Sequence, residues 1–377
     1  MITIPTTQIK TEIPPATGRP RPLLTPLPEP GHFLFIIDNS AAEKFVCPTL
    51  AANYLVEGRE PHPTNAALIF GGALHVGIEE LLRGPTLAEA MVPESPANLL
   101  RRAQERLTKF FTDHPAPLDE YRTLNNALEV LRFYQQRMTF PDYQMEILSD
   151  SKGPLIERAF ELPLGVLEVN APIWLANAAP SLEYSISGQP EPRVFVSHVH
   201  VAWAGRIDVI AKCNGTARIV DHKTTSIGGD SFIADFHLSS QTRGYLWAAQ
   251  QLWPELNVSG FCLDAIKLKR PTGSAGLMER GPRGGDPALE FFRSYFDYSA
   301  PSVESWATNA LTRVEDFIHS LTRNYFPQEV TYCFNRKYGK CPYHDVCLIA
   351  QDSPEAAKKL LHSHAFRAVT WNPTADR

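Results

Sequence analysis

An Asn-Gly pair, Asn214 and Gly215, stands between two runs rich in Ile and Val, and it constrains the fold of this chain more than any other feature. Such a pair between apolar runs is the strongest short-range signal for a β-hairpin with a two-residue turn. Residues equally far from the turn then pair, so Asp208 lies opposite Asp221. Opposed side chains share a face, with β-carbons about 5 Å apart. Two carboxylates that close repel each other, and a divalent cation between them would turn this conflict into a binding site.

The same face of the predicted hairpin carries two basic residues. Arg206 lies opposite Lys223, and Lys223 follows Asp221 at i+2, so both share a strand face. Ile210 and Ile219 form the neighbouring pair on that face and give it an apolar floor. Two acids and a lysine suit metal-dependent phosphodiester hydrolysis, in which carboxylates hold Mg²⁺ or Mn²⁺ and the lysine positions the nucleophile or stabilises charge. An exposed hairpin with a ladder of charges explains the spacing equally well.

The composition bounds the class of protein. The chain has 377 residues, 44% of them hydrophobic, which is enough for one large domain or two. No run approaches the length of a membrane span and the N-terminus has no apolar signal region, so we expect a soluble cytoplasmic protein without membrane contact. The net charge of −5 gives no general support for nucleic-acid binding, so any such surface must be local.

The order of the predicted segments indicates an α/β fold with a central mixed sheet flanked by helices. Helical periodicity dominates first, and three strands, a helix and a further strand follow. We divide the chain into a disordered Pro-rich arm (1–31), a helical region that carries Cys47 and His75 (32–150), a core that contains the hairpin (151–270), a C-terminal helix and cysteine-rich segment that close the same domain (271–350), and a polar tail (351–377).

Two predicted helices carry further polar residues. Gln241 and Tyr245 are four residues apart, hence neighbours on one face of a helix that follows the strand of Lys223. Upstream, Gly71 precedes His75 by one helical turn. A lone histidine on a helix is more often a structural residue than a metal ligand. The position of His75 on this helix therefore does not by itself show which of these roles it has.

Four motifs follow one another along the chain: Gly71-x3-His75, Gly205-x2-Asp208, Asp221-x-Lys223 and Gln241-x3-Tyr245. This ordered set resembles the RecB-like branch of the PD-(D/E)xK nuclease superfamily, which includes CRISPR-associated RecB-like exonucleases, the nuclease domains of recombination helicase complexes and phage-encoded relatives. The resemblance covers most of residues 33–350 and implies a restriction-endonuclease-like core, with 151–270 as the nuclease core.

The resemblance also implies roles for individual residues. Metal would be held by His75, Asp208, Asp221 and the main-chain carbonyl of His222. The catalytic residues would be Asp208 and Asp221 together with Lys223, the catalytic lysine, and Gln241 and Tyr245, which would organise the site and contact the DNA strand.

Three cysteines stand near the end of the globular region, in the pattern Cys333-x7-Cys341-x5-Cys347. Three thiols cannot complete a four-cysteine site, and Cys47 is the best fourth ligand although it is far away in sequence. The set lacks the Cys-x2–4-Cys pair that is usual for zinc, whereas an iron–sulfur cluster is compatible. The arrangement of one early and three late cysteines along the chain also resembles that of the [4Fe–4S]-bearing members of the family. His344 in place of one cysteine is a minor alternative.

Other residues receive a structural interpretation. His198 and His200 share a strand face and could bind a metal, but no carboxylate is spaced to join them. Cys213 and Cys262, on predicted strands, are expected to be buried thiols. Glu157 could face the site from the first strand, but the sequence does not fix its side.

The resulting prediction is a Mg²⁺- or Mn²⁺-dependent DNA exonuclease that acts in recombination, repair or processing. Its partners would be single-stranded DNA or duplex ends. The chain has no Gly-x4-Gly-Lys-Ser/Thr loop, so ATP-driven unwinding would come from a helicase or recombination protein in trans. The alternatives are a non-catalytic DNA-end-binding subunit of a recombination or CRISPR-adaptation assembly, and an iron–sulfur redox protein.

Overall fold

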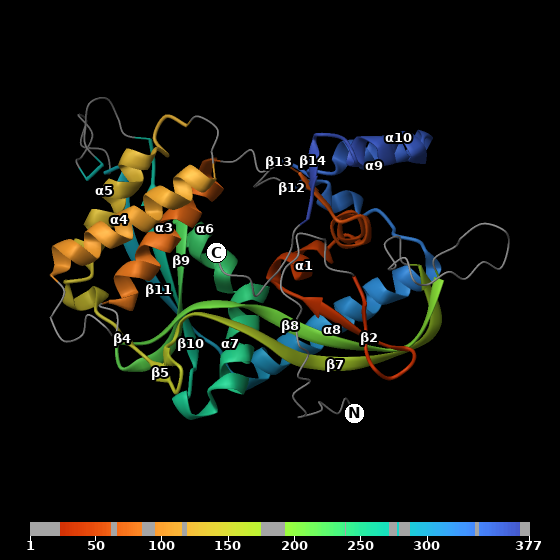
Figure 1. The fold of residues 1–377 in the computed structure, drawn as a ribbon, viewed down its shortest axis with the longest axis horizontal. Helices are drawn as coiled ribbons and strands as arrows, with labels where there is room; N and C mark the ends of the chain where they lie inside the picture. The colour runs from red at the N-terminus through yellow and green to blue at the C-terminus, as the bar shows by residue number, and fades with distance from the viewer. Residues whose placement is uncertain are drawn as a thin grey trace. The chain divides into compact units, whose positions relative to one another are not determined.

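The chain divides into two compact units in the computed structural model (Figure 1). The model describes residues 23–61, 66–84, 95–114, 119–174, 193–237, 239–270, 277–278, 287–335 and 339–369. The first unit comprises residues 1–62, 159–205 and 304–376, and the second comprises 63–158 and 206–303. Most of the predicted Pro-rich arm, up to residue 22, lies outside the described residues.

The strands of the second unit form a mixed sheet around the predicted hairpin. β8 (Arg193–Cys213) and β9 (Thr216–Thr225) are antiparallel neighbours, β9 pairs in parallel with β10 (Gly260–Leu268), and β10 pairs antiparallel with β11 (Leu289–Asp297). β4 (Glu146–Ile147) also pairs with β8, and so does β7 (Ile156–Trp174), most of which belongs to the first unit. The parallel step from β9 to β10 needs a crossover, which α6 (Asp230–His237) and α7 (Ser240–Leu252) supply. The α/β class with a central mixed sheet is confirmed.

The hairpin register agrees with the sequence prediction. Asn214 and Gly215 have φ angles of 51° and 77°, as a type I′ turn requires at its two central residues. Cys213 pairs with Thr216, and the pairing continues without a slip to Val209 and Val220. Asp208 and Asp221 would come next in this register, one position beyond the observed pairs.

Helices pack on one face of this sheet, and a buried core of helix and strand residues holds them there (Figure 1). These helices are α3 (Ala66–Arg83), α4 (Pro96–Asp113) and α5 (Leu124–Arg137). Ser95 and Thr123 cap α4 and α5, because each side-chain oxygen accepts a hydrogen bond from the amide three residues on. The apolar faces of α4 and α5 form part of this core, with Leu107 and Leu131 fully buried. Smaller elements of the unit are η2 (Pro141–Tyr143), β5 (Ser149–Asp150), β6 (Gly153–Pro154) and η3 (Pro254–Leu256).

The first unit combines strands and helices from distant parts of the chain. Its N-terminal elements are β1 (Thr25–Pro26), β2 (His32–Ile37), α1 (Asn39–Lys44), α2 (Pro48–Ala51), η1 (Ala52–Val56) and β3 (Arg59–Pro61). Its C-terminal elements are α8 (Ala300–Arg323), η4 (Val330–Tyr332), β12 (Phe334–Asn335), β13 (Gly339–Lys340), α9 (His344–Asp352), α10 (Pro354–Leu361) and β14 (Phe366–Ala368). Within it, β2 pairs in parallel with the first part of β8, and β14 pairs with β3.

Two segments differ from the sequence prediction. We expected helical structure from Phe33 onward, but β2 occupies His32–Ile37, because its continuous apolar run is buried on both faces as a central strand. The expected polar tail is ordered as α10 and β14 as far as residue 369. Among the described residues, no helix has the length and apolar character needed to cross a membrane.

Candidate metal centre

A glycine lets α3 approach β9 closely enough to bring His75 to the hairpin. A β-carbon at Gly71 would lie 2.7 Å from Oγ1 of Thr224 on β9, which is closer than real β-carbons come to other atoms. Gly71 therefore removes the side chain that would separate helix and strand. His75, one turn further along α3, faces the acids of the sheet.

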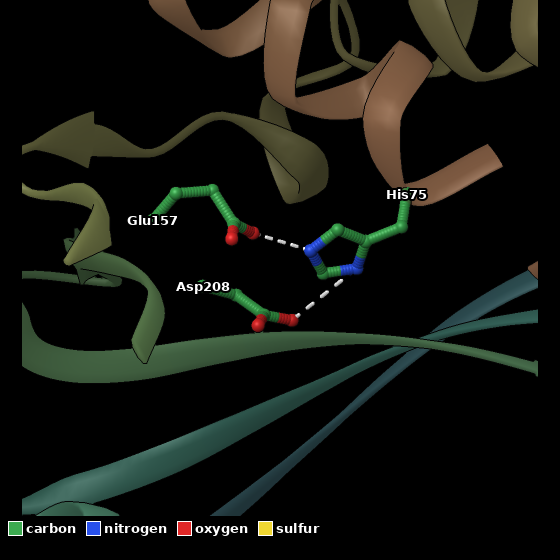
Figure 2. A group of neighbouring side chains, drawn as sticks. All are labelled: His75, Glu157 and Asp208. Carbon is green, nitrogen blue, oxygen red and sulfur yellow. Dashed lines mark hydrogen bonds and ion pairs between the residues drawn. The ribbon is translucent and has the colours of Figure 1, made fainter. Parts of the chain in front are cut away.

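Three buried side chains converge at this point (Figure 2). Nε2 of His75 contacts Oε1 of Glu157, and Nδ1 of His75 lies 3.5 Å from Oδ2 of Asp208. One ligand atom from each of the three lies within 4.8 Å of the others. His75 comes from α3, Glu157 from the start of β7 and Asp208 from β8, so three separate elements build the group.

Asp221 and Lys223 form an ion pair on β9, next to Asp208. Nζ of Lys223 lies 2.9 Å from Oδ1 and 2.7 Å from Oδ2 of Asp221. Burial raises the pKa of Asp221 to about 6 and the Asp208 carboxyl raises it too, while the Lys223 ammonium opposes the shift. The repulsion that the hairpin pattern predicts is therefore present. Asp208 also accepts a hydrogen bond of 3.3 Å from the His222 amide, which ties it to β9.

Arg206 lies behind Glu157. Nη1 of Arg206 donates to the Glu157 carbonyl at 3.1 Å, and its Nε lies 3.8 Å from the carboxylate. We expected Arg206 to join the lysine on the hairpin; its described contacts are instead with the glutamate that the sequence could not orient.

The side chain of His222 enters a buried polar network on the helical side of the sheet. Its Nε2 lies 3.0 Å from the hydroxyl of Tyr134, which donates to Asp264 at 2.8 Å. Asp264 is completely buried and also accepts from Tyr143 at 2.7 Å and from two nitrogens of Arg293 at 2.9 and 3.1 Å. Burial lowers the pKa of His222 to about 4, so its imidazole is neutral at pH 7. No spacing in the sequence predicts this network, because its members come from five separate segments.

Gln241 and Tyr245 both lie on α7, the crossover helix that packs against β10. Gln241 is in the first turn, where its amide donates to Oγ of the capping residue Ser239, and Tyr245 is buried one turn later. Their position on one helix face follows from the i, i+4 spacing. Their predicted part in the site stays a prediction.

The four cysteines of the predicted cluster lie near one another within the first unit. Cys47 begins α2 and accepts from the Glu329 amide at 3.5 Å, and Cys341 donates its amide to the Cys333 carbonyl at 2.9 Å. Burial, together with the charges of the other three cysteines, raises the pKa of Cys347 to about 11. Cys213 and Cys262 are confirmed as buried thiols in the second unit.

Comparison with known proteins places these observations in a family. The family model of the PD-(D/E)XK nuclease superfamily matches residues 46–348. Among solved structures, the chain is similar to a protein from Eubacterium rectale that is provisionally named an exonuclease, with a TM-score of 0.43 and 12% identity over 83% of this chain and 87% of that one. No curated protein matches the sequence.

Proposed function

Because the chain belongs to the PD-(D/E)XK nuclease superfamily, we propose that it is a Mg²⁺- or Mn²⁺-dependent DNA exonuclease of the RecB-like branch, acting in recombination, repair or processing. The observation that carries this proposal is the convergence of His75, Glu157 and Asp208, with ligand atoms within 4.8 Å of one another. The ion pair of Asp221 and Lys223 lies beside them on β9.

The converging side chains fit a divalent ion as a donor set. All three are buried, and the two carboxylates bring the negative charge and the oxygen ligands that Mg²⁺ and Mn²⁺ favour. Asp221 and the His222 carbonyl are the further ligands that the family resemblance implies. When bound, the ion supplies a Lewis acid that polarises the phosphate and lowers the pKa of a water ligand.

The residues around the metal ligands have separate tasks in this proposal. Lys223 keeps its ammonium beside Asp221, from where it would position the attacking water or stabilise the charge that develops on the phosphate. Arg206 orients Glu157 through its bond to the Glu157 carbonyl. Gln241 and Tyr245 would organise the site and contact the DNA strand from one face of α7. The substrate would be single-stranded DNA or duplex ends, unwound by a helicase or recombination protein in trans.

We also propose that Cys47, Cys333, Cys341 and Cys347 hold a [4Fe–4S] cluster. Four thiols in one place are the donor set that such a cluster needs. A single zinc ion with bonds of about 2.3 Å needs sulfurs about 3.8 Å apart. Among the described residues, the only group of three or more His, Cys, Asp or Glu side chains with ligand atoms within 4.8 Å of one another is the one around His75. The sulfurs of the four cysteines are therefore spaced more widely than one zinc ion requires, and this spacing favours the cluster. The cluster would join the α2 region to the C-terminal segment.

End-labelled linear DNA tests the nuclease proposal. Purified protein with Mn²⁺ or Mg²⁺ should release nucleotides from the ends of linear DNA and leave closed circular DNA intact. Asp208→Asn and Asp221→Asn should abolish release, whereas Glu146→Gln, an exposed acid paired with Lys212 in the same unit, should keep it. Cleavage by Asp221→Asn would overturn the proposed site. Tight binding of DNA ends without cleavage by the wild type would instead indicate the non-catalytic end-binding subunit.

Optical absorption tests the cluster proposal separately. Protein purified without oxygen should be brown with a broad visible band, and Cys341→Ser should lose the band while Cys213→Ala keeps it. Wild-type protein that is colourless and contains one zinc ion would favour zinc over the cluster.

A further inference from the structure

Three histidines gather on one face of the first unit, apart from the residues assigned above. β2 pairs in parallel with β8 in a register that places His32 beside His198 and Leu34 beside His200. Side chains alternate along a strand, so His198 and His200 share a face and His32 joins them. The sequence offered no carboxylate for the pair on β8, but the structure brings Glu29 to them from the turn before β2.

The three imidazoles are in direct contact. Nδ1 of His32 and Nε2 of His200 lie 3.0 Å apart, and the ring of His32 also packs on His198 with centroids 4.4 Å apart. Two imidazole nitrogens bound to one tetrahedral zinc ion stand about 3.3 Å apart. The nitrogens of His32 and His200 therefore already have nearly the separation of two ligands of one ion.

Hydrogen bonds around the cluster show which nitrogens are available as ligands. The hydroxyl of Ser197 donates to the Gly31 carbonyl at 3.0 Å, so it accepts from Nδ1 of His198 at 3.2 Å, which leaves the Nε2 lone pair of His198 available. Nε2 of His32 lies 3.4 Å from Oε1 of Glu29, while Nδ1 faces His200. A carboxylate on the second nitrogen is the usual outer partner of a metal-bound histidine, because it fixes the ring and strengthens the ligand.

We propose that His32, His198 and His200 form a binding site for a zinc-class divalent transition-metal ion, with Glu29 as the outer partner of His32. Three neutral imidazoles suit Zn²⁺, Ni²⁺ or Cu²⁺, in contrast to the carboxylate-rich centre around Asp208. The ion replaces the proton between His32 and His200, and His200 takes its other neutral tautomer. As they stand, the nitrogens of the three histidines do not all lie within 4.8 Å of one another, so His198 completes the set by turning its ring until Nε2 faces the ion.

An ion between β2 and β8 would close a long loop of the chain, since His32 and His200 are 168 residues apart. The site would therefore fasten β2 to the sheet.

Cobalt is the probe that separates this site from the cysteines and from the nuclease centre. Full-length protein in excess Mg²⁺ is titrated with Co²⁺ and followed by visible absorption. Imidazole ligands give only weak d–d bands, whereas cysteines add an intense thiolate-to-cobalt band in the near ultraviolet. We expect d–d bands that saturate at about one equivalent and disappear in the double variant His32→Gln, His200→Gln.

Two controls keep the test decisive. His364→Gln, at an exposed histidine of the same unit, should leave the cobalt spectrum unchanged. The double variant should keep its circular dichroism and its cleavage of linear DNA, so that loss of the bands cannot be ascribed to unfolding. Zn²⁺ should also raise the melting temperature of the wild type more than that of the double variant. Identical cobalt bands in both proteins would overturn the site.

Discussion

Glu157 has a left-handed backbone, with φ of 52°, and its carboxylate contacts Nε2 of His75. A non-glycine residue in this conformation costs about 1 kcal/mol or more and persists where the surroundings require it. The strained backbone turns Glu157 toward the two ligands of the proposed metal centre, His75 and Asp208. Strain of this kind is typical of functional sites.

Removing the charge of Glu157 should impair the centre without unfolding the protein. Glu157→Gln keeps the size of the side chain and its contact with His75 but removes one of two converging negative charges. We expect cleavage of linear DNA to fall by about 100-fold and the Mn²⁺ concentration for half-maximal activity to rise. Glu146→Gln serves as the control. Unchanged Mn²⁺ dependence in Glu157→Gln would remove Glu157 from the ligand set.

Replacing Lys223 should separate metal binding from catalysis. Lys223→Met removes the cation that lies 2.7 Å from Asp221 and competes with a metal ion for it. Calorimetric titration should therefore show Mn²⁺ affinity equal to or above that of the wild type. Single-turnover cleavage should fall by about 100-fold or more. If Lys223→Met loses Mn²⁺ binding as well, the lysine supports the fold of the site and not the reaction.

Breaking the buried network should destabilise the second unit. Asp264→Asn leaves the guanidinium of Arg293 buried without its counter-charge, and we expect a loss of about 3–5 kcal/mol in the free energy of unfolding. Tyr143→Phe removes a single hydrogen bond and should cost about 1–2 kcal/mol. Tyr325→Phe, at an exposed tyrosine outside the network, is the control. Urea unfolding curves measure all three, and equal stabilities would contradict this account of the core.

His222 should make stability depend on pH. Its pKa is about 4 in the folded protein against an ordinary 6.5, because burial disfavours the charged imidazole. Above pH 6.5 both folded and unfolded states are neutral at this residue. Between pH 6.5 and 4 the unfolded state takes up the proton first, so stability falls as the pH falls, by up to about 3 kcal/mol. The loss should be absent in His222→Gln, measured as the difference between the two proteins' unfolding free energies at each pH.

The features that the sequence predicted correctly are those that local rules determine. The Asn214–Gly215 turn fixes the register of its hairpin, and helical spacing places Gln241 and Tyr245 on one face. Glu157 could not be oriented, because Leu155, Ile156 and Glu157 are all buried in succession and the left-handed residue breaks the alternation of a strand.

Other features depend on contacts between distant segments and leave no periodic pattern. Asp264 gathers two tyrosines and an arginine from three separate elements, and no spacing in the sequence connects them. The prediction of a helix over the residues of β2 is wrong, because periodicity alone does not distinguish a buried strand from a buried helix. Its parallel pairing with β8 brings His32 to His198, a contact that spacing cannot predict.

The two-residue turn of the hairpin also sets how this protein tolerates insertions and deletions. An added residue can be taken up as a longer loop with a bulge, which leaves the strand pairing intact. Deleting Gly215 leaves too short a connection, and a slip of one residue would turn Asp221 and Lys223 to the opposite face of β9. During evolution or laboratory engineering, this loop should therefore lengthen freely and resist shortening.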